Sequence, residues 1–136
     1  MCELCPRRCG VDRSSGATGF CGAGGSAVRI SRAALHAWEE PCISGTRGSG
    51  TIFFSYCTLR CVYCQNLPVS RGIAGIEVEI SRLAEIMLEL EAQGAHNINL
   101  VTPTHYAAQI LEAIEIARRR GLSLPIVYNT GGYELS

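Results

Sequence analysis

Three cysteines near the middle of the chain have the type and spacing of a metal-binding loop. Cys57, Cys61 and Cys64 are separated by three and then by two residues. Thiolates are soft ligands that select iron–sulfur clusters, zinc or copper(I). A cubane cluster held by three protein sulfurs keeps one iron with an open coordination position, whereas structural metal sites are closed. The spacing therefore predicts a metal site that performs chemistry.

A second set of cysteines lies near the N-terminus. Cys2, Cys5 and Cys9 show the same two short gaps in the opposite order, and Cys21 follows after eleven further residues. Four thiolates complete a tetrahedral zinc site or bind a second cluster, and neither leaves an open position. We expect a structural or electron-carrying metal here rather than free thiols, with zinc and a cluster both left open. Cys42 stands alone, and a lone cysteine is usually a small buried hydrophobe.

The composition is that of one globular domain. The chain has 136 residues, of which 47% are hydrophobic, with 12 basic and 12 acidic side chains and 8 cysteines. A net charge of zero lacks the basic footprint of nucleic-acid-binding proteins, so we expect no nucleic-acid partner. No stretch approaches the roughly 20 apolar residues of a membrane span, and the first residues do not form a signal peptide. Because thiols stay reduced in the cytoplasm, metal binding explains the cysteines better than disulfides, and we expect a cytoplasmic protein.

The elements that must position the central cysteines begin at residue 51. Residues 1–50 are rich in Gly, Ser, Arg and Cys, which predicts a loop-built metal-binding segment without a core of its own. Beyond them, strand and helix patterns alternate, with strands expected at 51–55, 97–101 and 124–128 and helices at 81–93 and 104–120. This alternation is typical of a parallel sheet covered by helices.

We therefore predict an α/β fold: the N-terminal part of a partial parallel (β/α) barrel, preceded by a Cys-rich loop segment. Residues 51–136 would supply its three strands and two helices. A closed barrel takes about 250 residues, so we expect the chain to be truncated at its C-terminal side. The cysteines at 57–64 directly follow the first predicted strand, where α/β folds place their active sites.

The C-x3-C-x2-C spacing, with Tyr63 before its last cysteine and a strand before its first, resembles that of the radical S-adenosylmethionine superfamily. The wider run from Glu39 to Asn66 is similar to an uncharacterised branch related to pyruvate formate-lyase activating enzymes. The resemblance implies that Cys57, Cys61 and Cys64 hold a 4Fe-4S cluster whose open iron takes the amino and carboxylate groups of S-adenosylmethionine. One-electron reduction then gives a 5'-deoxyadenosyl radical that abstracts hydrogen from a substrate.

The same resemblance implies further site residues. Tyr63 lies where the family's hydrophobic residue packs near the adenine. Thr102 and Thr104 end the second predicted strand, where such enzymes often carry a Gly-Gly-Glu motif that binds the cofactor's amino group and that is absent here. Their hydroxyls are candidates to replace it, although helix capping explains Thr104 equally well. Asn129 follows the third strand, where the family contacts the ribose, and a plain turn competes. We expect His105 to be a first-turn helix residue rather than a ligand.

The resemblance also implies partners, namely a reductant such as flavodoxin or ferredoxin and a protein substrate. A competing hypothesis is a non-catalytic iron–sulfur or zinc module that carries electrons or binds a partner. The two hypotheses differ in whether S-adenosylmethionine is cleaved to 5'-deoxyadenosine.

Overall fold

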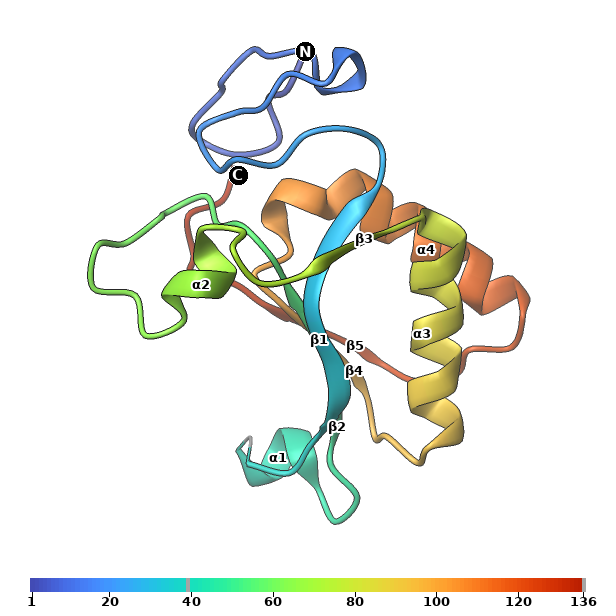
Figure 1. The fold of residues 1–136 in the computed structure, drawn as a ribbon. Helices are drawn as coiled ribbons and strands as arrows, with labels where there is room; N and C mark the ends of the chain where they lie inside the picture. Colours follow the sequence, from blue (N-terminus) through green and yellow to red (C-terminus); the bar gives the residue numbers. More distant parts are fainter. Residues whose placement is uncertain (39, 136) are drawn as a thin grey trace.

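A five-stranded mixed sheet forms the centre of the structure (Figure 1). Its strands are β1 (Val28–His36), β2 (Ser49–Phe54), β3 (Ile76–Val78), β4 (Ile98–Val101) and β5 (Ile126–Asn129). Their order across the sheet is β3-β1-β2-β4-β5. The computed structural model describes residues 1–38 and 40–135, so Glu39 at the start of the run quoted above lies outside the described residues.

Three of the strands are parallel, and along the chain the short strand β3 lies between the first two of them. β2 pairs with β4 and β4 pairs with β5, so that Phe53, Val101 and Asn129 form one row across the sheet. β1 is antiparallel to both of its neighbours, β2 and β3. The carboxyl ends of β2, β4 and β5 therefore share one edge of the sheet, which we call the carboxyl edge.

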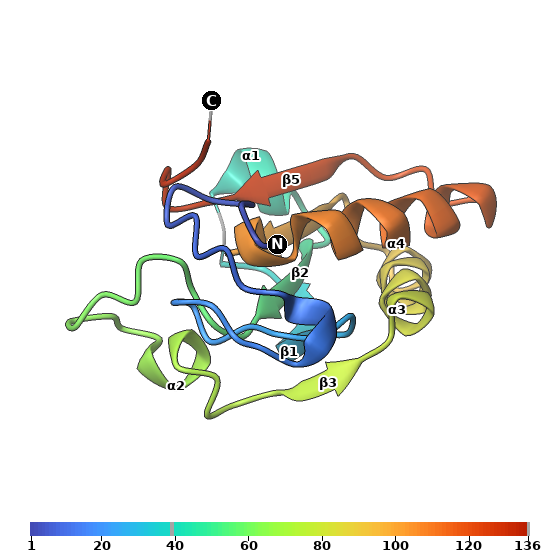
Figure 2. The ribbon, with the colours of Figure 1, turned by 90° about the horizontal axis from the view of Figure 1, so that it is seen from above.

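Two helices of 13 residues connect the parallel strands. α3 (Ile80–Ala92) leads into β4, and α4 (Ala107–Arg119) leads from β4 to β5. Figure 2 shows both helices on the same side of the sheet and against each other. Right-handed crossovers produce this placement when successive strands are added in one direction. The shorter helical segments are η1 (Arg13–Ser15), α1 (Pro41–Ser44), α2 (Leu67–Ser70) and η2 (Thr104–Tyr106).

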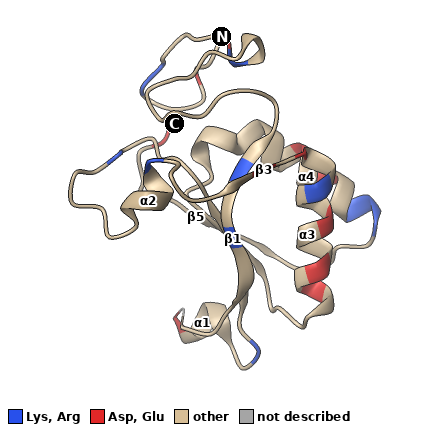
Figure 3. Cartoon of the chain, viewed as in Figure 1, with Lys and Arg blue, Asp and Glu red and all other residues tan. Residues whose placement is uncertain are grey.

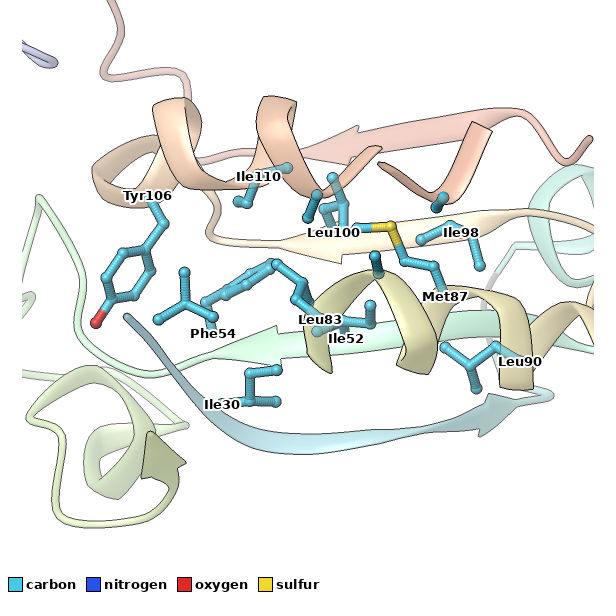
Figure 4. Packing of buried hydrophobic residues seen from close by; sticks show 14 of the residues in the cluster. Ile30, Ile52, Phe54, Leu83, Met87, Leu90, Ile98, Leu100, Tyr106 and Ile110 are labelled. Carbon is cyan, nitrogen blue, oxygen red and sulfur yellow. The ribbon is translucent and has the colours of Figure 1, made fainter. Parts of the chain in front are cut away.

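Apolar side chains fill the space between the sheet and these two helices (Figure 4). Leu83, Met87 and Leu90 recur at helical spacing on α3 and are at most 2% exposed. They pack in one cluster with Ile52 of β2 and Leu100 of β4, both fully buried. Burying a side chain of this size stabilises the fold by about 1.5–3 kcal/mol. The core therefore fixes the strands whose ends form the carboxyl edge.

The predicted α/β class is confirmed as a mixed α/β fold with an open sheet. The three predicted strands correspond to β2, β4 and β5, and the two predicted helices to α3 and α4. The prediction that residues 1–50 contain loops alone is wrong, because β1 lies among them. Val28 and Ile30 are buried and alternate with the partly exposed Arg29 and Ser31, a period of two that indicates a strand. The three-residue β3 also lies outside the prediction.

The segment before β1 lies over the carboxyl edge (Figure 1). Arginines are distributed through this segment and the cysteine loop, whereas acidic residues gather along α3 (Figure 3). There Arg82 pairs with Glu85 and Glu89 at 3.1 and 2.6 Å. Within the described ranges, no helix is long and apolar enough to cross a membrane.

Candidate functional site

The loop after β2 brings the central cysteines to the carboxyl edge. Cys57 and Cys64 line a pocket of about 80 Å³, together with Thr102 at the end of β4. The backbone N–H of Thr102 donates a hydrogen bond of 2.9 Å to the carbonyl of Asn129 at the end of β5. The structure thus brings together residues of three strand ends that the sequence singled out separately.

The backbone at this edge is strained. Tyr56 and Arg60 in the cysteine loop have φ angles of 70° and 51°, and Thr102 has a φ of 56°. Residues other than glycine enter this left-handed region at a cost of about 1–2 kcal/mol, and such strain clusters at functional sites. Of the four such residues in the described part of the chain, three lie here, and the fourth, Arg8, lies in the N-terminal cysteine segment.

Contacts with the segment around α2 hold the start of the cysteine loop. The backbone N–H of Tyr56 donates to the carbonyl of Val69 at 2.8 Å, and the Ser55 hydroxyl donates to the carbonyl of Ala74 at 2.8 Å. Gly72 has a φ of 73°, and a Cβ atom there would lie 2.1 Å from the Tyr56 ring. Because glycine has no side chain, the Tyr56 ring can pack directly against Gly72. This contact positions the residue immediately before Cys57, the first cysteine of the loop.

The three thiols of the loop are half-buried, and the loop tip is open. The backbone N–H of Cys64 donates to the carbonyl of Cys61 at 3.4 Å, which closes a turn between these two cysteines. Tyr63 within this turn is 88% exposed, so its ring is accessible to a ligand. The role of Tyr63 beside an adenine remains a prediction.

Thr104 has surroundings different from those of Thr102. It is 4% exposed, its hydroxyl donates to the carboxylate of Glu134, and the Tyr128 hydroxyl donates to it at 3.3 Å. Glu134 also accepts a hydrogen bond from Thr130. The sequence did not predict Glu134 as a site residue, because only the turn after β5 brings its carboxylate to the carboxyl edge. The Thr104 hydroxyl is therefore engaged by protein groups.

The donor set of the loop fits an iron–sulfur cluster in its chemistry. In residues 1–38 and 40–135, no three His, Cys, Asp or Glu side chains already stand as ligands around one point. Metal binding and local ordering are coupled, however, because thiols lose their protons and move onto the metal as it binds. Three half-buried thiols on one loop, two of them in the wall of one pocket, are the ligands that such clusters require.

The N-terminal cysteines gather around a second, narrower cavity of about 10 Å³. Its walls include Cys2, Cys5, Cys9 and Cys21. Backbone N–H groups donate to the sulfurs of Cys9 and Cys21 at 3.3 and 3.4 Å. Burial raises the pKa of the Cys21 thiol, and the nearby Cys2 and Cys5 raise it further. The structure thus groups all four cysteines predicted to hold the second metal.

His105 lies in the wall of the same cavity. It belongs to η2, directly before α4, as expected for a first-turn residue, and it is 2% exposed. Its Nε2 atom lies 2.7 Å from the carbonyl oxygen of Ser55, at the start of the cysteine loop. Burial lowers the pKa of His105 to about 4, so the ring is neutral at pH 7.

Cys42 is exposed in α1. The expectation that this lone cysteine is buried is therefore wrong. Its distance in sequence from both cysteine sets makes it a convenient control position for substitutions.

The chain has a relative among known proteins. An uncharacterized protein of Methanocaldococcus jannaschii is 29% identical over 141 residues, an alignment that covers 97% of this chain and 39% of the relative. The chain thus spans about two fifths of the length of the relative it matches. No protein-family model matches the chain, and no solved structure matches it. Any proposal of function therefore rests on the residues of the site.

Proposed function

We propose that this chain is a radical S-adenosylmethionine iron–sulfur protein related to the pyruvate formate-lyase activating enzymes. The observation that carries the proposal is the position of the C-x3-C-x2-C motif. Cys57, Cys61 and Cys64 lie in the loop after β2, at the carboxyl edge, and the first and last of them line a pocket with Thr102. Ligands and reactive groups of α/β folds occupy this edge.

The winding of the sheet supports the same proposal. β2, β4 and β5 are parallel neighbours in the sheet, with α3 and α4 on one face (Figure 1). We propose that β2, β4 and β5 belong to part of a parallel (β/α) barrel, because a doubly wound sheet carries helices on both faces.

We assign the residues the roles that the resemblance implies. Cys57, Cys61 and Cys64 hold a 4Fe-4S cluster, and Tyr63 contacts the adenine of S-adenosylmethionine. When bound and supplied with one electron, this cluster and cofactor yield methionine and a 5'-deoxyadenosyl radical that takes a hydrogen atom from the substrate. Thr102 beside the pocket binds the cofactor's amino group, and the neighbouring Asn129 contacts its ribose.

Two further assignments complete the proposed site. Thr104 contributes its hydroxyl to the cofactor only after releasing Glu134, its present partner. The N-terminal cysteines hold a second cluster or zinc. Four thiols around one cavity support a closed, structural site there.

The exposed tip of the cysteine loop supports the proposed partners. Val62 and Tyr63 are 84% and 88% exposed, so two large apolar side chains face outward beside the cluster ligands. We propose that a reductant such as flavodoxin or ferredoxin, and a protein substrate, approach from this side. The cytoplasm is the compartment in which the eight thiols stay reduced.

A non-catalytic iron–sulfur or zinc module, for electron transfer or partner binding, is the second candidate function. The pocket of about 80 Å³ favours it. Ligand sites usually enclose about 300–1,000 Å³, so the pocket formed by these residues surrounds only part of a cofactor as large as S-adenosylmethionine.

Cofactor cleavage separates the two functions. The chain is reconstituted anaerobically with iron and sulfide and then given dithionite and S-adenosylmethionine. The enzyme proposal predicts 5'-deoxyadenosine and methionine in equal amounts, and none from a variant with Cys57→Ala, Cys61→Ala and Cys64→Ala. A Cys42→Ala variant should match the unaltered chain. A protein that assembles the cluster but forms no 5'-deoxyadenosine supports the non-catalytic module.

A further inference from the structure

The cavity beneath the N-terminal cysteines has the size of a single atom. Its volume of about 10 Å³ is near the lower limit for one water molecule. A cubane cluster of four irons and four sulfides is far larger. A cavity this small suits a single metal ion better than a cluster, and His105 lies in its wall together with the cysteines.

That donor is His105, whose orientation is set by the cysteine loop. A carbonyl oxygen only accepts hydrogen bonds, so the 2.7 Å contact with Ser55 places the proton on Nε2. Nδ1 is then the ring nitrogen that is left to bind a metal. This atom is buried and has no hydrogen-bond partner within the described residues. A buried acceptor left unpaired destabilises the fold, unless a ligand occupies it.

We propose that the N-terminal segment binds one Zn²⁺ ion through the thiolates of Cys5, Cys9 and Cys21 and through Nδ1 of His105. Three sulfurs and one imidazole nitrogen make a common closed tetrahedral zinc site. The hydrogen bond from Nε2 to a carbonyl is the usual support of a metal-bound histidine. This inference rests on the second metal site proposed above and specifies it as zinc, with His105 in place of Cys2 as the fourth ligand. It does not depend on the cluster at the central cysteines.

The surroundings of the four N-terminal thiols indicate which three of them bind the zinc ion. Cys5 is buried, and the sulfurs of Cys9 and Cys21 accept backbone hydrogen bonds, which stabilise bound thiolates. Cys2 lines the cavity as well, but it is only half-buried, it also lines a second, wider groove beside Asp12, and no backbone N–H is found on its sulfur within the described residues. We therefore assign Cys2 no bond to the ion.

The charge of the site is compensated by a neighbouring arginine. A zinc ion with three thiolates carries one net negative charge. Arg13 lies in the cavity wall and donates through Nη1 to the backbone carbonyl of His105 at 2.5 Å. Its Nε and Nη2 atoms are buried without a hydrogen-bond partner in the part of the chain that is described. An anionic metal site beside them would attract this cation, whose guanidinium also lies 5.4 Å from the centroid of the Tyr106 ring.

The ion would join the N-terminal segment to the sheet. Cys5, Cys9 and Cys21 lie before β1, whereas His105 lies between β4 and α4. As the described side chains do not yet surround one point, binding must draw the sulfurs toward Nδ1. The free energy of metal binding then orders a segment that has few apolar contacts of its own.

Zinc-edge X-ray absorption of the full chain tests this assignment. The protein carries Cys57→Ala, Cys61→Ala and Cys64→Ala, so that neither zinc nor a cluster occupies the other loop, and it is loaded with zinc alone. We expect one zinc per chain with three sulfurs at about 2.3 Å and one nitrogen at about 2.0–2.1 Å. A shell of four sulfurs, or the absence of bound zinc, would overturn the proposal.

Variants in the same background identify the donors. His105→Gln should remove the nitrogen from the zinc shell and weaken zinc binding at least about tenfold. His36→Gln and Cys2→Ser should leave the shell unchanged. A nitrogen that persists in His105→Gln would show that another group binds the ion. If that variant fails to fold, the spectrum of the chain with His105 intact still distinguishes a shell of three sulfurs and one nitrogen from a shell of four sulfurs.

Discussion

The Nε atom of Arg7 donates a hydrogen bond of 3.1 Å to the carbonyl oxygen of Thr58, which joins the two cysteine sets across 51 residues of sequence. The same guanidinium lies 3.9 Å from the centroid of the Phe20 ring. Arg60 of the central loop in turn donates to the carbonyl of Phe20 at 2.8 Å. Two arginines thus fasten the N-terminal segment to the loop of the proposed cluster.

Arg7→Ala should loosen this connection. Its hydrogen bond and ring contact are partly exposed, so we expect the free energy of unfolding to fall by about 1 kcal/mol. Urea denaturation measures the change. Arg32→Ala, at an exposed position of β1, is the control and should alter stability by less than about 0.5 kcal/mol. Equal changes in the free energy of unfolding for the two variants would show that the contacts of Arg7 do not stabilise the fold.

Gly72→Ala should displace the Tyr56 ring and disturb the cysteine loop. Gly121→Ala is a matched control, because Gly121 also has a positive φ, of 106°, but open space around its Cα. We expect the control to lose about 1–2 kcal/mol through backbone strain alone. Gly72→Ala should lose about 1–3 kcal/mol more through the clash, and should bind less iron after reconstitution. Indistinguishable urea midpoints and iron contents would contradict this account of the loop.

Single substitution of Cys57, Cys61 or Cys64 by alanine should prevent stable assembly of the 4Fe-4S cluster, because two thiolates do not hold it. Iron and sulfide analysis with visible absorption measures the loss. Cys42→Ala should retain the full cluster. A variant of the first group whose iron and sulfide contents equal those of Cys42→Ala would remove that cysteine from the ligand set.

Leu83→Ala should lower the free energy of unfolding by about 2–5 kcal/mol, because it empties space in the core between α3 and the sheet. Leu83 is fully buried, whereas Leu111 on α4 is 66% exposed. Leu111→Ala should therefore change stability by less than about 0.5 kcal/mol. Thermal or urea unfolding of the two variants tests whether the core lies on this face of the helices.

The parallel part of the fold could be predicted because its signals are local. Apolar runs mark β2, β4 and β5, and Gly94 follows α3 with a φ of 96°, as a helix stop requires. β1 escaped prediction because only Val28 and Ile30 among its first residues are apolar, in a segment dominated by Arg, Ser and Gly. β3 has three residues and is stabilised by pairing with β1 rather than by any pattern of its own.

The cysteines of the site could be read from their spacing, but their surroundings could not. His105 has no partner close in sequence, and its position beside the N-terminal cavity depends on Ser55, 50 residues earlier. Likewise, Glu134 reaches Thr104 only through the turn after β5. Contacts of this kind arise when distant segments meet at one edge of a sheet, so they appear only in the folded chain.

The most direct test of the proposed function is electron paramagnetic resonance of the reduced cluster with and without S-adenosylmethionine. The account places an open iron at the loop formed by Cys57, Cys61 and Cys64, and this iron must bind the amino and carboxylate groups of the cofactor. Addition of S-adenosylmethionine should therefore change the g values of the reduced cluster. Adenosine, which lacks the amino and carboxylate groups, should leave them unchanged. A 4Fe-4S spectrum that S-adenosylmethionine leaves unchanged would contradict the central claim.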